Sequence, residues 1–338
     1  MNILKKIIYL ILFLFSFQFG NAQQISETER LATLGKIWGF LKYYHPEVAA
    51  GKYNWDEQFI GILPEIRKAE NSTQISKIYL SWIDQLGMVN PCKKCNPDPD
   101  KEYFDKNFDL SWTQDATLFT KELSNRLKYI ENNRFQGKPY YVSTYSTGQI
   151  EVINEPKYNN FQYPDGKYRL LALAKYWNVV EYFFPYKYMT DQDWNEVLTE
   201  MIPKFLGAKD ATEYHLAMLE LVTKIDDTHA YLKSNIIDEY FGQKRLNIKF
   251  KIIDNLAVIT DFYSDSLAKI NDLKIGDIIT HFNEKSVSAI LNENYKYIPA
   301  SNRASKLRFS QYLIFKSRTD SLRIRILKDK LERNKTIA

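Results

Sequence analysis

An internal duplication constrains the fold of this chain more than any other feature of its sequence. Residues 30–86, here called copy one, align without a gap to residues 169–225, copy two, at a constant offset of 139 positions. Thirteen of the 57 aligned positions are identical, and they include two tryptophans and two prolines. The identical pairs are Arg30/Arg169, Leu31/Leu170, Leu34/Leu173, Lys36/Lys175, Trp38/Trp177, Tyr43/Tyr182, Pro46/Pro185, Trp55/Trp194, Glu57/Glu196, Pro64/Pro203, Ala69/Ala208, Thr73/Thr212 and Leu80/Leu219. Segments that keep this register are expected to fold and pack alike.

Each copy has the periodicity of helices interrupted by proline. Apolar residues three and four positions apart, such as Leu34 and Trp38, predict helices with one buried face. Pro46 and Pro185 are predicted to end the first helix of each copy, because proline removes a donor and clashes with the preceding turn. Each copy therefore reads as three helices.

The segment between the copies is predicted to elaborate the helical domain. It contains a cysteine loop, a helix over residues 112–133, and a β-hairpin over residues 140–153 with Thr147-Gly148 at its turn. The helical domain is expected to span residues 23–237.

After Asp238 the apolar pattern changes from helical to alternating, which predicts strands. Ile248, Phe250 and Ile252 would share one face, and Asp254-Asn255 would form the turn to a return strand. A further strand is expected over residues 278–282, a helix over 303–315, and a last strand at SLRIRIL. The predicted fold class is α+β, with a β-rich domain over residues 238–332 and a tail over 333–338.

Residues 1–22 resemble a cleaved export signal. Lys5 and Lys6 precede an apolar run that ends in Gly20-Asn21-Ala22, the small-x-small pattern of a signal peptidase site. We expect export to the periplasm or the exterior and no membrane span after cleavage, with a membrane anchor as the alternative. Cleavage would lower the formal net charge from +5 to +3, which is too small and dispersed for a nucleic-acid surface.

The two cysteines, Cys92 and Cys95, predict a small disulfide loop in an exported protein. A thiol oxidoreductase is the rival interpretation, but Pro91, Pro97 and Pro99 oppose the helix that would lower a thiol pKa. No metal site and no cofactor are expected, because further cysteine ligands are lacking.

The stretch KIDDTHAYL, residues 224–232, is the candidate catalytic segment. Continuing the apolar spacing of the preceding helix by four residues from Ile225 places His229 on a face that is packed or lines a cleft. His229 is a candidate general base, with Thr228 and Asp227 as orienting groups, because imidazole titrates near neutral pH and needs a neighbour to fix its tautomer. The alternative is a buried structural histidine, and spacing alone leaves both open. Copy one has Asn90 at the corresponding position, so the helix itself does not demand a histidine.

The pattern LKxGDxIxxxN, present as Leu273 to Asn283, and the order of strands around it resemble a PDZ domain. That resemblance implies an extended peptide or protein C-terminus bound at a sheet edge near Leu246, Ile248 and Phe250. The sequence GQKRLNIKF stands where such domains carry a GLGF-type carboxylate loop. A PDZ-like spacer that binds nothing is the alternative.

A helical domain, a THAY sequence and a PDZ-like domain together resemble the tail-specific, or C-terminal processing, serine peptidases, and within them the tricorn-like branch. The family reads Ser-His-Ala-Tyr at this place, so His229 matches its general base and Thr228 replaces the adjacent serine. Ala230 and Tyr231 complete the match. The resemblance covers most of residues 28–330.

The family's nucleophilic serine lies in an α/β domain after the PDZ domain, and no Gly-x-Ser-x-Gly elbow occurs in these 338 residues. A base without nucleophile and oxyanion site cannot perform acyl transfer. The resemblance thus implies the N-terminal and PDZ-like part of an exported serine peptidase, inactive as this chain alone. The alternative is a non-catalytic peptide-binding or scaffolding protein.

Overall fold

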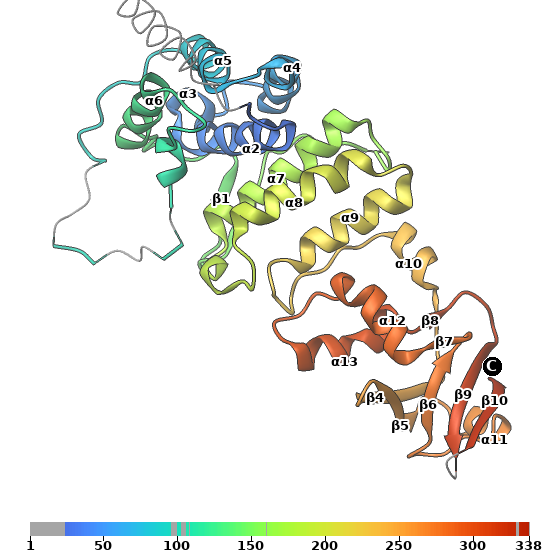
Figure 1. The fold of residues 1–338 in the computed structure, drawn as a ribbon. Helices are drawn as coiled ribbons and strands as arrows, with labels where there is room; N and C mark the ends of the chain where they lie inside the picture. The colour runs from blue at the N-terminus through green and yellow to red at the C-terminus, as the bar shows by residue number, and fades with distance from the viewer. Residues whose placement is uncertain are drawn as a thin grey trace, which may run out of the picture. The chain divides into compact units, whose positions relative to one another are not determined.

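The computed structural model describes residues 24–95, 100–102, 106–107, 109–159, 161–328 and 331–337. It is an α+β protein, as the sequence predicts, with helices in the N-terminal part and an antiparallel sheet in the C-terminal part (Figure 1). The predicted export signal lies outside the described residues. Within them, no helix is long and apolar enough to cross a bilayer.

The chain divides into two compact units, Met1–Pro156 and Lys157–Ala338. Each unit holds one copy of the duplication, and in the second unit the helices share a core with the sheet: Leu216 and Leu219 pack with Ile248 and Phe282. The helical domain expected over residues 23–237 would hold both copies, and no sequence pattern marks this shared core.

The described residues of the first unit form six helical segments and a hairpin. They are α2 Glu27–Tyr44, α3 Pro46–Ala49, α4 Trp55–Lys68, α5 Ser72–Gln85, η1 Ser111–Gln114, α6 Lys121–Asn132, β1 Val142–Thr144 and β2 Ile150–Val152. The helix predicted over residues 112–133 is therefore two shorter helices. The hairpin forms as predicted, and Gly148 takes the positive φ of 83° that its turn requires.

The helices of copy two repeat those of copy one at the sequence offset of 139. They are α7 Gly166–Phe183, α8 Trp194–Gly207 and α9 Ala211–Thr223. The short 3-10 helix η2, Lys187–Met189, lies between α7 and α8. Both bounds of α2 and of α4 coincide with those of α7 and α8 after the shift of 139. The N-cap residues correspond too, and in each the side chain accepts a backbone N–H of the first turn: Ser26/Asp165, Asn54/Asp193 and Asn71/Asp210.

The packing of the copies is also the same. Trp38 Nε1 donates to the carbonyl of Trp55 at 2.9 Å, and Trp55 Nε1 donates back to the carbonyl of Trp38 at 3.0 Å. Trp177 and Trp194 exchange the same two bonds at 2.7 and 3.0 Å. All four indoles are nearly inaccessible to solvent, so each pair fixes its first helix against its second.

The rest of the second unit is a six-stranded antiparallel sheet with short helices. Its elements are α10 Asn235–Phe241, β3 Lys244–Arg245, β4 Ile248–Ile253, β5 Leu256–Phe262, α11 Asp265–Ile270, β6 Ile278–Phe282, β7 Lys285–Ser286, α12 Val287–Asn294, η3 Tyr295–Tyr297, α13 Arg303–Leu313, β8 Lys316–Ser317, β9 Leu322–Lys328 and β10 Leu331–Ile337. The main strand order is β10-β9-β6-β5-β4, with β7 paired to β6 (Figure 1). β3 and β8 form a separate pair. The predicted turn at Asp254-Asn255 joins β4 to β5, with both residues at positive φ.

The predicted tail over residues 333–338 is a strand up to Ile337. It forms most of β10, which pairs with β9 from Leu331↔Lys328 to Ile337↔Leu322. Its charged sequence lacks apolar alternation, because most of its side chains are exposed at the edge of the sheet. Only the pairing with β9 identifies it.

Candidate functional site

The helix that leads to the candidate site ends earlier than the apolar spacing predicts. α9 stops at Thr223, and Asp226 adopts a left-handed backbone with φ of 49°. The side chain of His229 is consequently 94% exposed. The expectation that His229 continues the helical face that is packed or lines a cleft is wrong, since the helix ends at Thr223 and the chain turns at Asp226.

His229 and Asp227 form a hydrogen-bonded pair. The Nδ1 atom of His229 lies 3.0 Å from Asp227 Oδ1, and the backbone N–H of His229 donates to the same oxygen at 2.8 Å. The Asp227 carboxylate therefore hydrogen-bonds to the imidazole and also accepts the backbone N–H that closes the turn. When Nδ1 carries the proton, this contact orients the ring and leaves the Nε2 lone pair toward solvent.

Tyr176 of α7 is close enough to this carboxylate to feel its charge. Burial, and then the negative charge of Asp227, raise the pKa of Tyr176. The phenol of Tyr176 therefore stays protonated at neutral pH.

Thr228 contacts the segment before α13. Its hydroxyl lies 2.7 Å from Ser301 Oγ, its N–H donates to that oxygen at 3.2 Å, and Ser301 N–H donates to Thr228 Oγ1 at 3.2 Å. These three bonds join two residues that are 73 positions apart in the chain.

Asp226 holds the turn from another side. Its Oδ2 accepts the backbone N–H of Asp191 at 2.9 Å, and its Oδ1 lies 3.9 Å from Lys306 Nζ in the first turn of α13. Burial raises the pKa of the Asp226 carboxyl, although the N–H of Asp191 opposes that shift. Ser301, Asp191 and Lys306 were missed by the sequence analysis, and no local pattern marks them.

An ionic cluster anchors the last turns of α9 beneath the site. Glu220, whose side chain is 7% exposed, lies 2.5 Å from Lys204 and 3.2 Å from Lys296. Thr223 Oγ1 also donates to the carbonyl of Lys296 at 2.7 Å. These bonds hold α9 against α8 and η3, so the helix end from which the turn begins is fixed in position.

The neighbouring carboxylate, Glu200, completes the cluster. Desolvation opposes its ionisation, but hydrogen bonds from Lys204, Lys224 and Gln192 outweigh it and lower the pKa of Glu200 to about 2. Glu200 is thus ionised at any physiological pH.

The proposed peptide residues lie in the core of the second unit. Leu246, Ile248 and Phe250 are 8%, 3% and 3% exposed, and the ring of Phe250 packs edge-on against Phe315. An incoming peptide would therefore meet the outer backbone edge of β4, which is terminal in the sheet, rather than these side chains. Gln311 of α13 already reaches that edge, where its Oε1 accepts the Phe250 N–H at 3.5 Å.

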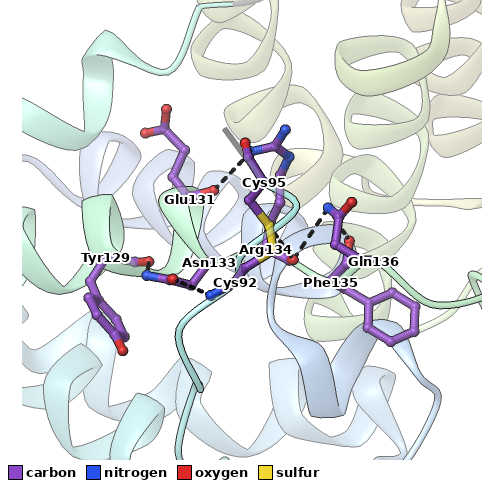
Figure 2. The surroundings of a disulfide bond; sticks show 8 residues. All are labelled: Cys92, Cys95, Tyr129, Glu131, Asn133, Arg134, Phe135 and Gln136. Carbon is purple, nitrogen blue, oxygen red and sulfur yellow. Dashed lines mark hydrogen bonds between the residues drawn. A yellow bond between two sulfur atoms is a disulfide. The ribbon is translucent and has the colours of Figure 1, made fainter. Parts of the chain in front are cut away.

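Cys92 and Cys95 form a disulfide, with Cα atoms 5.5 Å apart (Figure 2). Its surroundings come from the end of α6: Asn133 Oδ1 accepts the N–H of Cys92 at 2.7 Å, and Arg134 Nη1 donates to the carbonyl of Cys95 at 3.1 Å (Figure 2). Cys95 is 2% exposed, so the sulfur that could resolve a mixed disulfide is covered. These hydrogen bonds hold the disulfide loop after copy one against the end of α6.

The remaining histidines have other partners or none. His215 lies 2.7 Å from Ser234 Oγ, and His281 is 2.9 Å from Thr280 Oγ1. His45 is fully buried, and in the described part of the chain neither ring nitrogen has a partner with good hydrogen-bond geometry, although the Gly87 backbone lies close enough to affect its pKa. Over the same residues, no group of three or more His, Cys, Asp or Glu side chains could hold a metal ion.

No protein-family model matches the chain, and no curated protein matches it with significance. The geometry of the turn over residues 226–229 therefore carries the functional argument by itself.

Proposed function

We propose that the chain is the N-terminal and PDZ-like part of an exported serine-type peptidase of the tail-specific family, with His229 as its general base. The observation that supports this proposal is the pairing of His229 Nδ1 with Asp227 Oδ1 at 3.0 Å while the imidazole is 94% exposed. A base for acyl transfer needs a carboxylate behind one ring nitrogen and an accessible second nitrogen. A structural histidine would instead have both nitrogens satisfied inside the protein.

The nucleophile has to come from outside the described residues. Among them, no serine hydroxyl hydrogen-bonds to His229, whose one side-chain partner there is Asp227. Thr228 hydrogen-bonds to Ser301, so its hydroxyl is engaged away from the imidazole. We assign Asp227 the orienting role and Thr228 a structural one.

Hydrolysis by the complete gene product tests the proposal. A fluorescently labelled unstructured peptide should be cleaved by the wild-type product, and His229→Ala should lower kcat/KM by at least about 100-fold, the usual contribution of a positioned base. Asn90→Ala, at the corresponding position of copy one, is the matched control and should leave cleavage unchanged. Full turnover by His229→Ala would end the assignment.

A stand-alone peptide-binding protein is the second candidate. The observation that favours it is the terminal position of β4 in the sheet, where an extended peptide could add as a further strand. Binding of the labelled peptide without cleavage, lost when Lys251→Pro disrupts β4, would support this candidate over the peptidase. Sequencing of the gene beyond codon 338 separates the two at once, because the peptidase requires a following serine-bearing domain.

A further inference from the structure

We infer that Ser301 is a positioning residue for His229 and acts through Thr228. The inference rests on the proposed function, because it concerns how the base is held. No helix carries His229: α9 ends six residues before it, at Thr223. Contacts from elsewhere in the second unit must therefore fix the direction of the imidazole.

Ser301 supplies the most complete of these contacts. Its hydroxyl and its backbone N–H both hydrogen-bond to Thr228, at 2.7 and 3.2 Å, and the Thr228 N–H returns a bond to the hydroxyl at 3.2 Å. Paired bonds of this kind fix the orientation of a backbone as well as its position. Thr228 lies between Asp227 and His229, so holding it restricts both members of the pair.

The segment that carries Ser301 is itself anchored. Asn302, the next residue, is the N-cap of α13, and its side chain accepts the N–H of Ser305 at 2.9 Å. Lys306, one turn into α13, lies 3.9 Å from Asp226, and both side chains are at least four-fifths buried. The start of α13 thus contacts the turn at Asp226 and at Thr228, the residues on either side of Asp227.

The expected consequence concerns the tautomer of His229. With the turn held, Asp227 Oδ1 receives Nδ1–H and the lone pair stays on Nε2, the nitrogen that a nucleophile would meet. If the turn is loosened, His229 is expected to leave Asp227 and to favour Nε2–H, the wrong tautomer for a base at that atom.

Nitrogen-15 shifts of the histidine side chains, recorded on this chain at neutral pH, measure the tautomer without any need for activity. Ser301→Ala should lower the ratio of Nδ1–H to Nε2–H at His229 by up to about fivefold, the factor for one net hydrogen bond. Ser301→Thr, which keeps the hydroxyl, should restore it. Ser321→Ala, which removes an exposed hydroxyl elsewhere in the unit, should change nothing.

An unchanged ratio in Ser301→Ala, or a wild-type ratio that already favours Nε2–H, would overturn the inference. Should Ser301→Ala fail to fold, Thr228→Val tests the same contact from the other side, with Thr228→Ser as its conservative partner. Failure here is distinct from failure of the proposed function, which depends on hydrolysis by the complete product with and without His229.

Discussion

Asp226 and Gly87 occupy the same position of the duplicated unit, 139 residues apart, and both adopt a left-handed backbone, with φ of 49° and 87°. Glycine takes this conformation without a steric penalty, whereas an L residue pays about 1 kcal/mol or more. Non-glycine residues in such regions concentrate at functional sites. The strained copy is the one that leads to His229, and the relaxed copy leads to the disulfide loop.

The first prediction concerns this strain. Asp226→Gly relieves the backbone but loses the bond to the Asp191 N–H, two effects of about 1 kcal/mol each, so stability should stay nearly unchanged. Asp226→Ala loses the bond and keeps the strain, and it should be less stable by about 1 to 2 kcal/mol. Urea unfolding measures both. If alanine and glycine proved equivalent, the left-handed conformation would carry no cost here.

The second prediction uses the two tryptophan pairs as matched experiments. Trp38→Phe and Trp177→Phe each remove the indole hydrogen bond to a buried carbonyl, that of Trp55 or Trp194. Each should cost about 2 kcal/mol, from the lost hydrogen bond together with the lost volume. Near-equal losses in the free energy of unfolding, measured in urea, would show that the tryptophan pair stabilises both copies to the same extent.

Trp82→Phe is the control for that comparison. Its Nε1 donates at 3.0 Å to the side chain of Gln58, which can turn to water once the donor is gone. A loss as large as that of Trp38→Phe would mean that volume, and not the reciprocal bonds, dominates the cost.

The third prediction concerns the ionic cluster under the site. Glu220→Gln removes the buried negative charge that Lys204 and Lys296 share, and we expect a loss of about 1.5 kcal/mol, because Glu220 is buried while both lysines are partly exposed. Glu200→Gln, at a side chain that is 31% exposed, should cost clearly less because water screens the remaining charges. Thermal unfolding of the two variants at pH 7 compares them, and equal losses would contradict the weight given to burial.

The parts of the fold that the sequence could predict depend on local signals. Periodicity and proline placed the helices of both copies, and the Asp254-Asn255 turn located the β4–β5 hairpin. β10 escaped prediction because its pairing with β9 comes from a distant contact and not from its own pattern. Single residues set the ends of helices. The apolar spacing therefore predicted that α9 continues past its true end at Thr223.

The site itself was only half visible in the sequence. His229, Thr228 and Asp227 are adjacent, so a motif could mark them, whereas Ser301 reaches Thr228 only through the fold. Alternation showed that Ile248 and Phe250 share a buried face, but alternation cannot separate a core from a groove. The duplication held one unused signal: Gly87 at the position of Asp226 already indicated that the helix ends there.

The fourth prediction concerns acid stability and His45. This side chain is fully buried, and burial lowers the pKa of its imidazole from 6.5 to about 4, although the charge of Glu47 and the backbone of Gly87 oppose the shift. The unfolded chain takes up a proton below pH of about 6.5 and the folded chain only near pH 4, so the unfolded state binds more protons in this window. Stability should therefore fall as the pH drops from about 6.5 to about 4, by on the order of 3 kcal/mol in total.

Copy two offers the variant that tests this prediction, because phenylalanine, Phe184, stands at the position of His45. His45→Phe cannot titrate, so its free energy of unfolding in urea should be nearly flat between pH 6.5 and pH 4.5, apart from the background of other groups. If His45→Phe instead followed the wild-type curve, the acid sensitivity would belong to other groups and burial of His45 would not be its cause.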